Sequence, residues 1–138
     1  MLSLAALALL PLLAVLPTLA LALALPALAV LGASSEGGLV VKDAAELRVK
    51  ETDRITAVVT ELQRAGIHAV EHADGLTIHP GQPKPCDIHT YDDHRMAMSF
   101  SLLGLRTPGI RILDPACTAK TYPNFFHDLE SLCGKDHQ

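Results

Sequence analysis

The first 35 residues constrain this chain most, because they carry no charged side chain and consist mainly of Leu, Ala, Val and Pro. Such a segment has to be buried in protein or in lipid. It is long enough to cross a bilayer, but Pro11, Pro17 and Pro26 interrupt any straight helix, and no basic residues mark it as a secretory signal. We expect an apolar, low-complexity helical segment over residues 1–35, buried against partners in sequence that is absent from these 138 residues. The alternative is a membrane anchor formed by residues 1–33.

Residues 36–138 hold all the Asp, Glu, Lys and Arg side chains and form the second unit that we expect. The formal net charge of −4 and the isoelectric point near 5.9 argue against nucleic acid as a partner, since phosphate backbones attract basic surfaces. His68 and His72 share a predicted strand without a third ligand, so no metal site is expected. An odd number of cysteines without CxxC spacing favours reduced thiols. These cysteines are Cys86, Cys117 and Cys133.

Hydrophobic spacing in the charged unit predicts alternating strands and helices. Helices are expected over residues 51–65, 91–105 and 121–133, and strands over residues 39–42, 67–72, 76–79 and 110–113. The two middle strands flank an Asp74-Gly75 turn and read as a hairpin, and Gly66 supplies the end of the first helix. The fold class is therefore α/β, with repeated strand–helix units. A parallel sheet and a mixed sheet both remain open.

Cations stand at or just before the predicted helix starts. The helix dipole disfavours a cation there by roughly a few tenths of a kcal/mol or more. These residues are Lys50, Arg54, Arg95 and Lys120. Helix N-termini with added Lys or Arg form anion sites, and Glu51 adds a carboxylate suited to moving protons. The pattern indicates an anion-binding site whose reaction it does not specify.

A simpler interpretation is that each cation pairs with a neighbouring acid on the surface, a kind of contact that contributes little. Lys50 would pair with Glu51 or Asp53, and Arg95 with Asp92 or Asp93. Asp92 and Asp93 also suit the cap and first turn of the second helix.

Three segments together resemble a known enzyme family. They read LRVKETDRI at residues 47–55, TYDDHRMAMSFSL at residues 90–102 and DPACTAKTYPNFF at residues 114–126. In order and spacing they resemble the C-terminal part of 5-enolpyruvylshikimate-3-phosphate synthases, also called 3-phosphoshikimate 1-carboxyvinyltransferases. The resemblance covers roughly residues 39–133 and corresponds to about the last third of a family member. It implies that residues 36–138 are the C-terminal part of an enolpyruvyl transferase domain.

The resemblance implies an activity as well. The family transfers the enolpyruvyl group of phosphoenolpyruvate to the 5-hydroxyl of shikimate 3-phosphate and releases phosphate, on the route to chorismate and the aromatic amino acids. It uses two domains of repeated α/β units and needs no metal or organic cofactor. It implies a cytoplasmic enzyme whose other, N-terminal domain is a partner of this part.

Residue roles follow from the resemblance, position by position. Lys50 matches a lysine that contacts shikimate 3-phosphate, and Glu51 matches the proton donor to the methylene carbon of phosphoenolpyruvate. The cations that match those holding phosphoenolpyruvate are Arg54, Arg95 and Lys120. Asp93 and His94 are expected to support Glu51 and Arg95, with a plain helix cap as the alternative role of Asp93.

The chain departs from the family pattern at two places. The acid that accepts the proton in the family lies before the KETDR motif, whereas no acid precedes Glu36 here. Glu46 stands where many members carry an asparagine that touches the shikimate ligand. We therefore expect residues 1–138 not to turn over alone. The alternatives are a non-catalytic, membrane-tethered or decayed anion-binding remnant and the related enolpyruvyl transferase that acts on UDP-N-acetylglucosamine.

Overall fold

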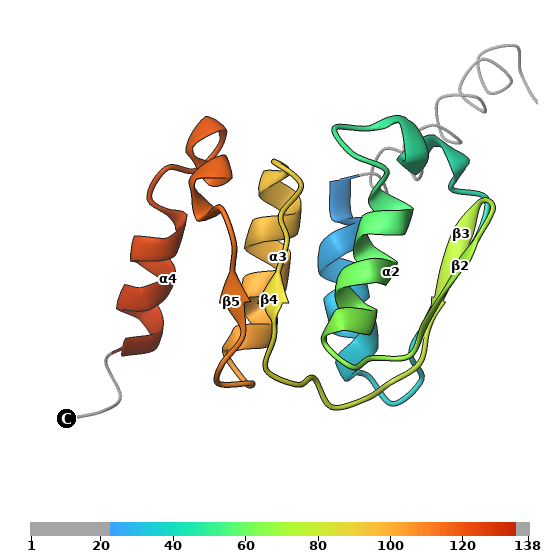
Figure 1. Ribbon diagram of the computed structural model, residues 1–138, viewed down its shortest axis with the longest axis horizontal. Coiled ribbons are helices and arrows are strands. Elements are labelled where there is room, and N and C mark those ends of the chain that lie inside the picture. Colours follow the sequence, from blue (N-terminus) through green and yellow to red (C-terminus); the bar gives the residue numbers. More distant parts are fainter. Residues whose placement is uncertain (1–22, 135–138) are drawn as a thin grey trace, which may run out of the picture.

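A computed structural model describes residues 23–134, and it packs helices and short strands side by side (Figure 1). Residues 23–34 form a helix that continues through Pro26, and Leu25, Ala29 and Val30 are buried. The predicted helix is confirmed over residues 23–34, while residues 1–22 lie outside the described residues. The predicted partners are wrong for this part, because the helix packs into the core of this chain itself. Within the described range, no helix combines the length and apolar character of a membrane span.

A three-stranded antiparallel sheet lies beside the helix α2, which spans Arg54–Arg64 (Figure 1). Its order is β1-β3-β2, with β1 at Leu39–Val41, β2 at Ala69–His72 and β3 at Gly75–Ile78. The register pairs His72 with Gly75, so Ala73 and Asp74 form the turn, one position earlier than predicted. The middle strand β3 buries Leu76 and Ile78.

The helix α2 spans Arg54–Arg64 and packs an apolar stripe into the core. The four residues at helical spacing are confirmed as buried: Ile55, Val58, Val59 and Leu62. The helix starts three residues later than predicted because Asp53 is its cap, and its side chain accepts the N–H of Thr56. Gly66 follows the helix with a φ of +78°, a conformation that glycine adopts without strain.

A parallel strand–helix–strand unit makes up the next part of the fold. The strands are β4 at Asp87–Ile88 and β5 at Arg111–Ile112, and the crossover helix α3 spans His94–Gly104. The predicted helix began at residue 91. Tyr91 and Asp92 instead take φ values of +56° and +53°, which a helix does not allow. The sequence did not indicate β4, which is too short to show a periodic pattern.

Two 3₁₀-helices and a last α-helix complete the chain: η1 at Ala45–Val49, η2 at Pro115–Lys120 and α4 at Phe125–Cys133. The predicted turn before the last helix is thus a 3₁₀-helix, and α4 starts four residues after the predicted boundary. The fold mixes an antiparallel sheet with a parallel pair, which decides a question that periodicity left open.

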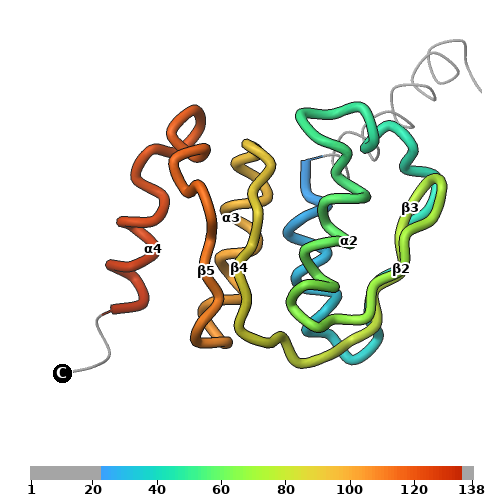
Figure 2. Tube along the Cα trace, viewed as in Figure 1, coloured from blue at the N-terminus to red at the C-terminus, as the bar shows by residue number. Residues whose placement is uncertain are grey.

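Chain direction brings the beginnings of several helices to one end of the molecule. In the trace, α2 and α3 both run away from the end at which η1 and η2 lie (Figure 2). The motif residues 48–54, 90–95 and 114–120 all lie at that end. The three cysteines are free, as expected. In the described part of the chain, no group of three His, Cys, Asp or Glu side chains is placed to hold a metal ion, and the ring of His68 stacks on that of His79.

Candidate functional site

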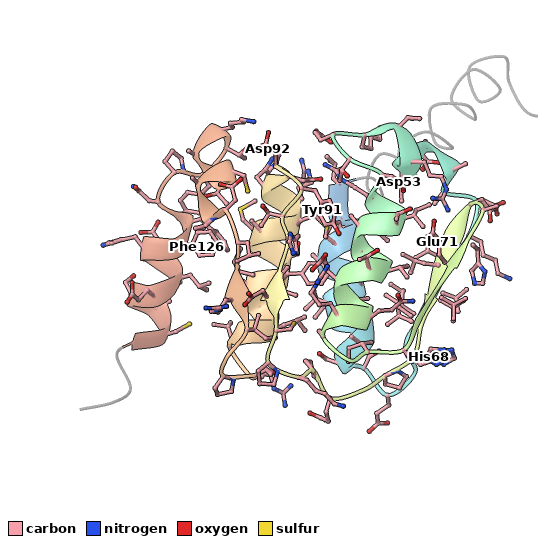
Figure 3. All side chains as sticks on the ribbon, viewed as in Figure 1. Asp53, His68, Glu71, Tyr91, Asp92 and Phe126 are labelled. Atoms are coloured by element: carbon pink, nitrogen blue, oxygen red, sulfur yellow. The ribbon has the colours of Figure 1, made fainter. Side chains whose placement is uncertain are left out.

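Side chains of the first two motifs lie at the same end of the molecule. Asp53, from the first motif, and Tyr91 and Asp92, from the second, are close to the starts of α2 and α3 (Figure 3). This end combines helix N-termini with cationic side chains. The structure therefore brings two segments that are about forty positions apart in sequence into one polar region.

Arg54 is the buried link between the first two motifs. Its residue is 1% exposed, and Nε donates to Oδ2 of Asp93 at 2.8 Å while an Nη donates to Oε2 of Glu51 at 2.7 Å. A buried guanidinium requires charged partners in good geometry, and its planar fork can serve two carboxylates at once. Arg54 thus fixes the exposed carboxylate of Glu51 relative to the start of α3.

Asp93 performs two tasks with its two oxygens. Its carboxylate is fully buried; Oδ2 accepts from Arg54 and Oδ1 accepts the backbone N–H of Arg95 at 2.9 Å. The second bond satisfies one of the open donors at the start of α3. Asp93 is thus the cap of α3, and its link to Glu51 within residues 23–134 runs through Arg54.

The remaining cations of the site are held less firmly. Arg95 is half-buried, and its Nη1 donates to the carbonyl of Leu23 at 3.1 Å, in the helix of residues 23–34. Lys50 is exposed on the loop between η1 and α2. Since a guanidinium has five N–H donors, Arg95 keeps donors for an anion while the bond to Leu23 fixes its direction.

Lys120 lies in a setting that differs from the prediction. It is the last residue of η2, with α4 starting at Phe125, so it does not stand at the start of the last helix. A cation at that end of a helix agrees with the dipole. Its Nζ pairs with Oδ2 of Asp92 at 3.0 Å, and both side chains are about two-thirds exposed, at 67% and 69%.

His94 and Glu46 are the least informative of the candidates. His94 opens α3 and is half-buried, and its ring shares no hydrogen bond with Glu51 or Arg95 among the contacts of the described chain. Glu46 lies in η1, and within residues 23–134 its Oε1 is a buried oxygen that has no donor.

A buried carboxylate that the sequence did not single out supports the second motif. Glu61 of α2 is 0% exposed. It accepts the hydroxyl of Tyr91 at 2.7 Å, the backbone N–H of His89 at 3.0 Å and Nε of Arg64 at 3.1 Å. Burial and the bond to Glu61 raise the pKa of Tyr91 to about 12. Glu61 thus holds the turn that precedes Asp93. Local sequence pattern does not indicate this role, because Glu61 and Tyr91 are 30 positions apart.

Comparison with known proteins agrees with this arrangement. The family model described as EPSP synthase (3-phosphoshikimate 1-carboxyvinyltransferase) matches residues 18–129. The 3-phosphoshikimate 1-carboxyvinyltransferase of Trichormus variabilis is 50% identical over 97 residues, which are 70% of this chain and 23% of that protein. The enzyme of the same name from Haemophilus influenzae strain PittGG is 47% identical over 105 residues, 74% of this chain and 24% of that protein.

A solved structure shows the same likeness in three dimensions. The EPSP synthase from Acinetobacter baumannii superposes with a TM-score of 0.72 and 38% identity, over 79% of this chain and 26% of that one. The chain spans about a quarter of the length of the curated relatives that it matches. Because the family model covers most of the chain and the relatives are 47–50% identical over the aligned part, the chain belongs to the EPSP synthase family.

Proposed function

We propose that this chain contributes to the transfer of the enolpyruvyl group of phosphoenolpyruvate to the 5-hydroxyl of shikimate 3-phosphate, with release of phosphate. The observation that carries the proposal is the buried Arg54, which joins Glu51 of one motif to Asp93 of the other at a shared helix end. Family membership supports the substrate pair, and the cationic end of the fold supports binding of multiply charged anions.

The roles we propose follow from where each group lies. Glu51 is exposed beside the buried cation, so its carboxyl can reach a substrate and give a proton to the methylene carbon of phosphoenolpyruvate. Protonation there leaves the adjacent carbon open to attack by the hydroxyl. Arg95 holds the carboxylate of phosphoenolpyruvate through its fork, and Lys120 acts as a point charge.

Lys50 is proposed to bind shikimate 3-phosphate, because it is exposed on the same loop as Glu51. Asp93 acts through Arg54 and the start of α3 rather than on substrate. The Glu46 carboxylate, in η1 just before this loop, disfavours a nearby phosphate through like charge. The remainder of a family enzyme is the partner that would supply the general base, and cytoplasm is the compartment that we propose.

Calorimetric titration of the 138-residue chain with phosphoenolpyruvate in the presence of shikimate 3-phosphate tests the proposal. Arg95→Ala is expected to weaken binding about tenfold or more, since hydrogen bonds to charged groups contribute about 1.5–3 kcal/mol. Arg111→Ala is the matched control, because Arg111 is an exposed arginine paired with Asp87 in the parallel strands. Equal affinities for the two variants would contradict the role of Arg95.

Phosphate release measures the second part of the proposal. Without the proton acceptor we expect no steady release by the 138 residues, because a missing general base lowers rates by about 10²–10⁴-fold. Steady release would show that this chain holds its own base. If the chain binds neither phosphoenolpyruvate nor shikimate 3-phosphate, the alternative of a non-catalytic remnant would be favoured. In a chain that includes the rest of the cleft, Arg95→Ala is expected to raise the apparent KM for phosphoenolpyruvate.

A further inference from the structure

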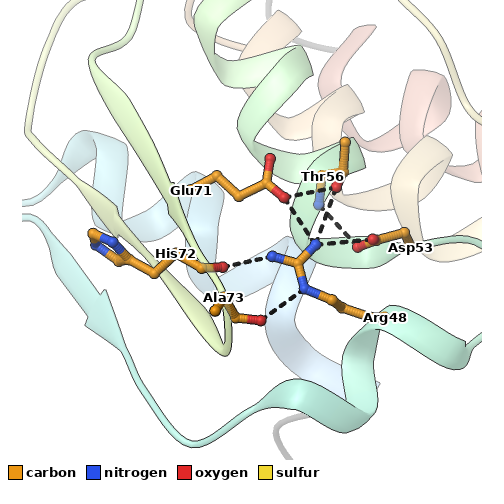
Figure 4. Close-up of polar contacts among 6 residues, drawn as sticks. All are labelled: Arg48, Asp53, Thr56, Glu71, His72 and Ala73. Carbon is orange, nitrogen blue, oxygen red and sulfur yellow. Dashed lines mark hydrogen bonds and ion pairs between the residues drawn. The ribbon is translucent and has the colours of Figure 1, made fainter.

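Arg48 forms the densest polar network of the described chain, although the resemblance assigns it no role. Its side chain, 26% exposed, reaches from η1 to Asp53, to α2 and to the β2–β3 hairpin (Figure 4). Nη1 donates to Asp53 at 2.9 Å, to Glu71 at 2.8 Å and to Thr56 at 3.2 Å. Nε donates to the carbonyl of Ala73 at 2.8 Å, and Nη2 to the carbonyl of His72.

These contacts close the loop that carries Lys50 and Glu51. Arg48 stands just before the loop and Asp53 just after it, and their ion pair joins the two ends. Asp53 is also the cap of α2, because its Oδ1 accepts the N–H of Thr56 at 3.1 Å. The same carboxylate thus fixes both the start of α2 and the end of the loop.

The loop has little else to hold its shape. Val49 is 81% exposed, and Lys50 and Glu51 are exposed as well, so burial of apolar surface does not determine the loop conformation. One anchor is the bond from Arg54 to Glu51. The other is Arg48, which ties the loop to the β2–β3 hairpin. The strand β3 of this hairpin is the middle strand of the sheet and contributes Leu76 and Ile78 to the core.

The charge of Arg48 is balanced by two carboxylates, whereas no ion pair within the described residues involves Lys50 or Arg95. Asp53 and Glu71 both lie within 2.9 Å of its Nη1, and hydrogen bonds to these carboxylates raise its pKa. Its Nε, Nη1 and Nη2 all donate to groups of Asp53, of α2 or of the β2–β3 hairpin. Arg48 is therefore suited to holding the loop and not to binding an anion.

We propose that Arg48 is a positioning residue that holds the loop of Lys50 and Glu51, so that Lys50 keeps the orientation needed to bind shikimate 3-phosphate. The part of the proposal that concerns the loop orientation is based on the contacts above. The identity of the ligand, shikimate 3-phosphate, is based on the proposed function. A planar fork is essential to this role, since a lysine ammonium cannot donate at once to the Asp53 side and to the carbonyls of the hairpin turn.

Hydrogen exchange of the full 138-residue chain tests the orientation of the loop. Arg48→Ala and Arg48→Lys are both expected to speed exchange of the amides of Thr56 and Ala57, which donate to Asp53 at the end of the loop. The expected acceleration is on the order of tenfold, through local opening, while the amides of α3 keep their rates. Arg111→Ala, which also removes an arginine–carboxylate pair, is expected to leave the loop unchanged. A lysine variant with wild-type protection of the Thr56 and Ala57 amides, or uniform acceleration over all amides, would overturn the proposal.

Carboxyl titration by NMR gives a readout that a general loss of stability does not imitate. Burial raises the pKa of Asp53, but the Thr56 N–H and Arg48 outweigh it and hold that pKa below its ordinary value. Arg48→Ala is expected to raise the pKa of Asp53, whereas Arg111→Ala is expected to raise that of Asp87, which Arg111 lowers. An unchanged pKa of Asp53 would contradict the role of Arg48.

Titration with shikimate 3-phosphate connects the loop to function. Both Arg48 variants are expected to weaken binding by on the order of tenfold, as local opening of the loop does, with phosphoenolpyruvate affected less. If the wild-type chain binds no shikimate 3-phosphate, the proposed ligand is wrong, and the exchange and carboxyl measurements still decide whether Arg48 positions the loop. Wild-type binding by Arg48→Ala would overturn the positioning role.

Discussion

The two parts of this fold differ in how firmly they are packed. From Leu25 to Leu103, every element except the exposed loops contributes to one apolar core. Beyond Leu103, as far as Gly134, the buried side chains of the described chain are only Thr107, Cys117 and Thr118, and α4 has none. The first two motifs therefore rest on the core, whereas the third lies on a lightly packed part.

The ion pairs of the site show the same difference. Arg54 and Asp93 meet in the interior with side-chain exposures of 2% and 0%, while Lys120 and Asp92 meet in solvent. A buried pair is costly to break because the remaining charge is left without compensation. An exposed pair contributes little. We conclude that the first two motifs are preorganised by the fold and the third is held loosely.

The largest effect is expected from Asp93→Ala. It removes one carboxylate partner of the buried Arg54 and the cap of α3, so the free energy of unfolding should fall by about 3–5 kcal/mol. Urea denaturation measures this change. Asp92→Ala serves as the control, since its carboxylate is exposed, and a similar loss for both variants would contradict the distinction between the two pairs.

Phe100→Ala should follow closely, with a loss of about 3–5 kcal/mol, because it opens a cavity in the core. Phe100 is 0% exposed in α3. Phe126→Ala in α4 is the matched change in the lightly packed part, where the ring is half-buried, and we expect a clearly smaller loss. Thermal or urea unfolding of both variants compares the two parts directly.

The pH dependence of Tyr91 probes the turn before Asp93. Because its folded pKa is raised from 10.0 to about 12, its contribution to stability is present below pH 10 and is lost as the pH rises through about 12. Glu61→Gln is expected to lower this pKa by removing the carboxylate. Phenolate absorbance in a Tyr122→Phe background, which leaves one tyrosine, measures it, and an unchanged titration would rule out the Glu61 contact.

The smallest effect on stability is expected from Lys120→Ala. Its pair with Asp92 is exposed on both sides, so the free energy of unfolding should change by less than about 1 kcal/mol. A substrate role predicts a larger effect on phosphoenolpyruvate affinity than on stability. Comparing calorimetry with urea unfolding separates the two, and a large loss of stability would show that the third motif is part of the core.

Local pattern was sufficient for much of this fold. The stripe from Ile55 to Leu62, the helix end at Gly66 and the hairpin are all encoded in neighbouring residues, and the structure confirms them. The starts of α2 and α3 were placed too early, because Asp53 caps one helix and Tyr91 takes a left-handed conformation before the other.

The support of the site could not be read in the same way. Arg48 contacts Glu71 across 23 positions and Glu61 contacts Tyr91 across 30, and charged residues at such positions look like ordinary surface side chains. The buried state of Arg54 was also hidden, since its partner Asp93 lies 39 positions away. Motifs thus indicated the candidate residues, and only the fold showed what holds them in place.

An NMR titration of the 138-residue chain with phosphoenolpyruvate and shikimate 3-phosphate tests the account most directly. We predict saturable shifts concentrated in the amides of residues 50–54 and 93–95, with weaker shifts near Lys120, because the first two motifs are held ready by Arg54 and Asp93. Shifts that are absent, or that spread over the surface without saturating, would contradict the claim that this end of the fold is an anion site.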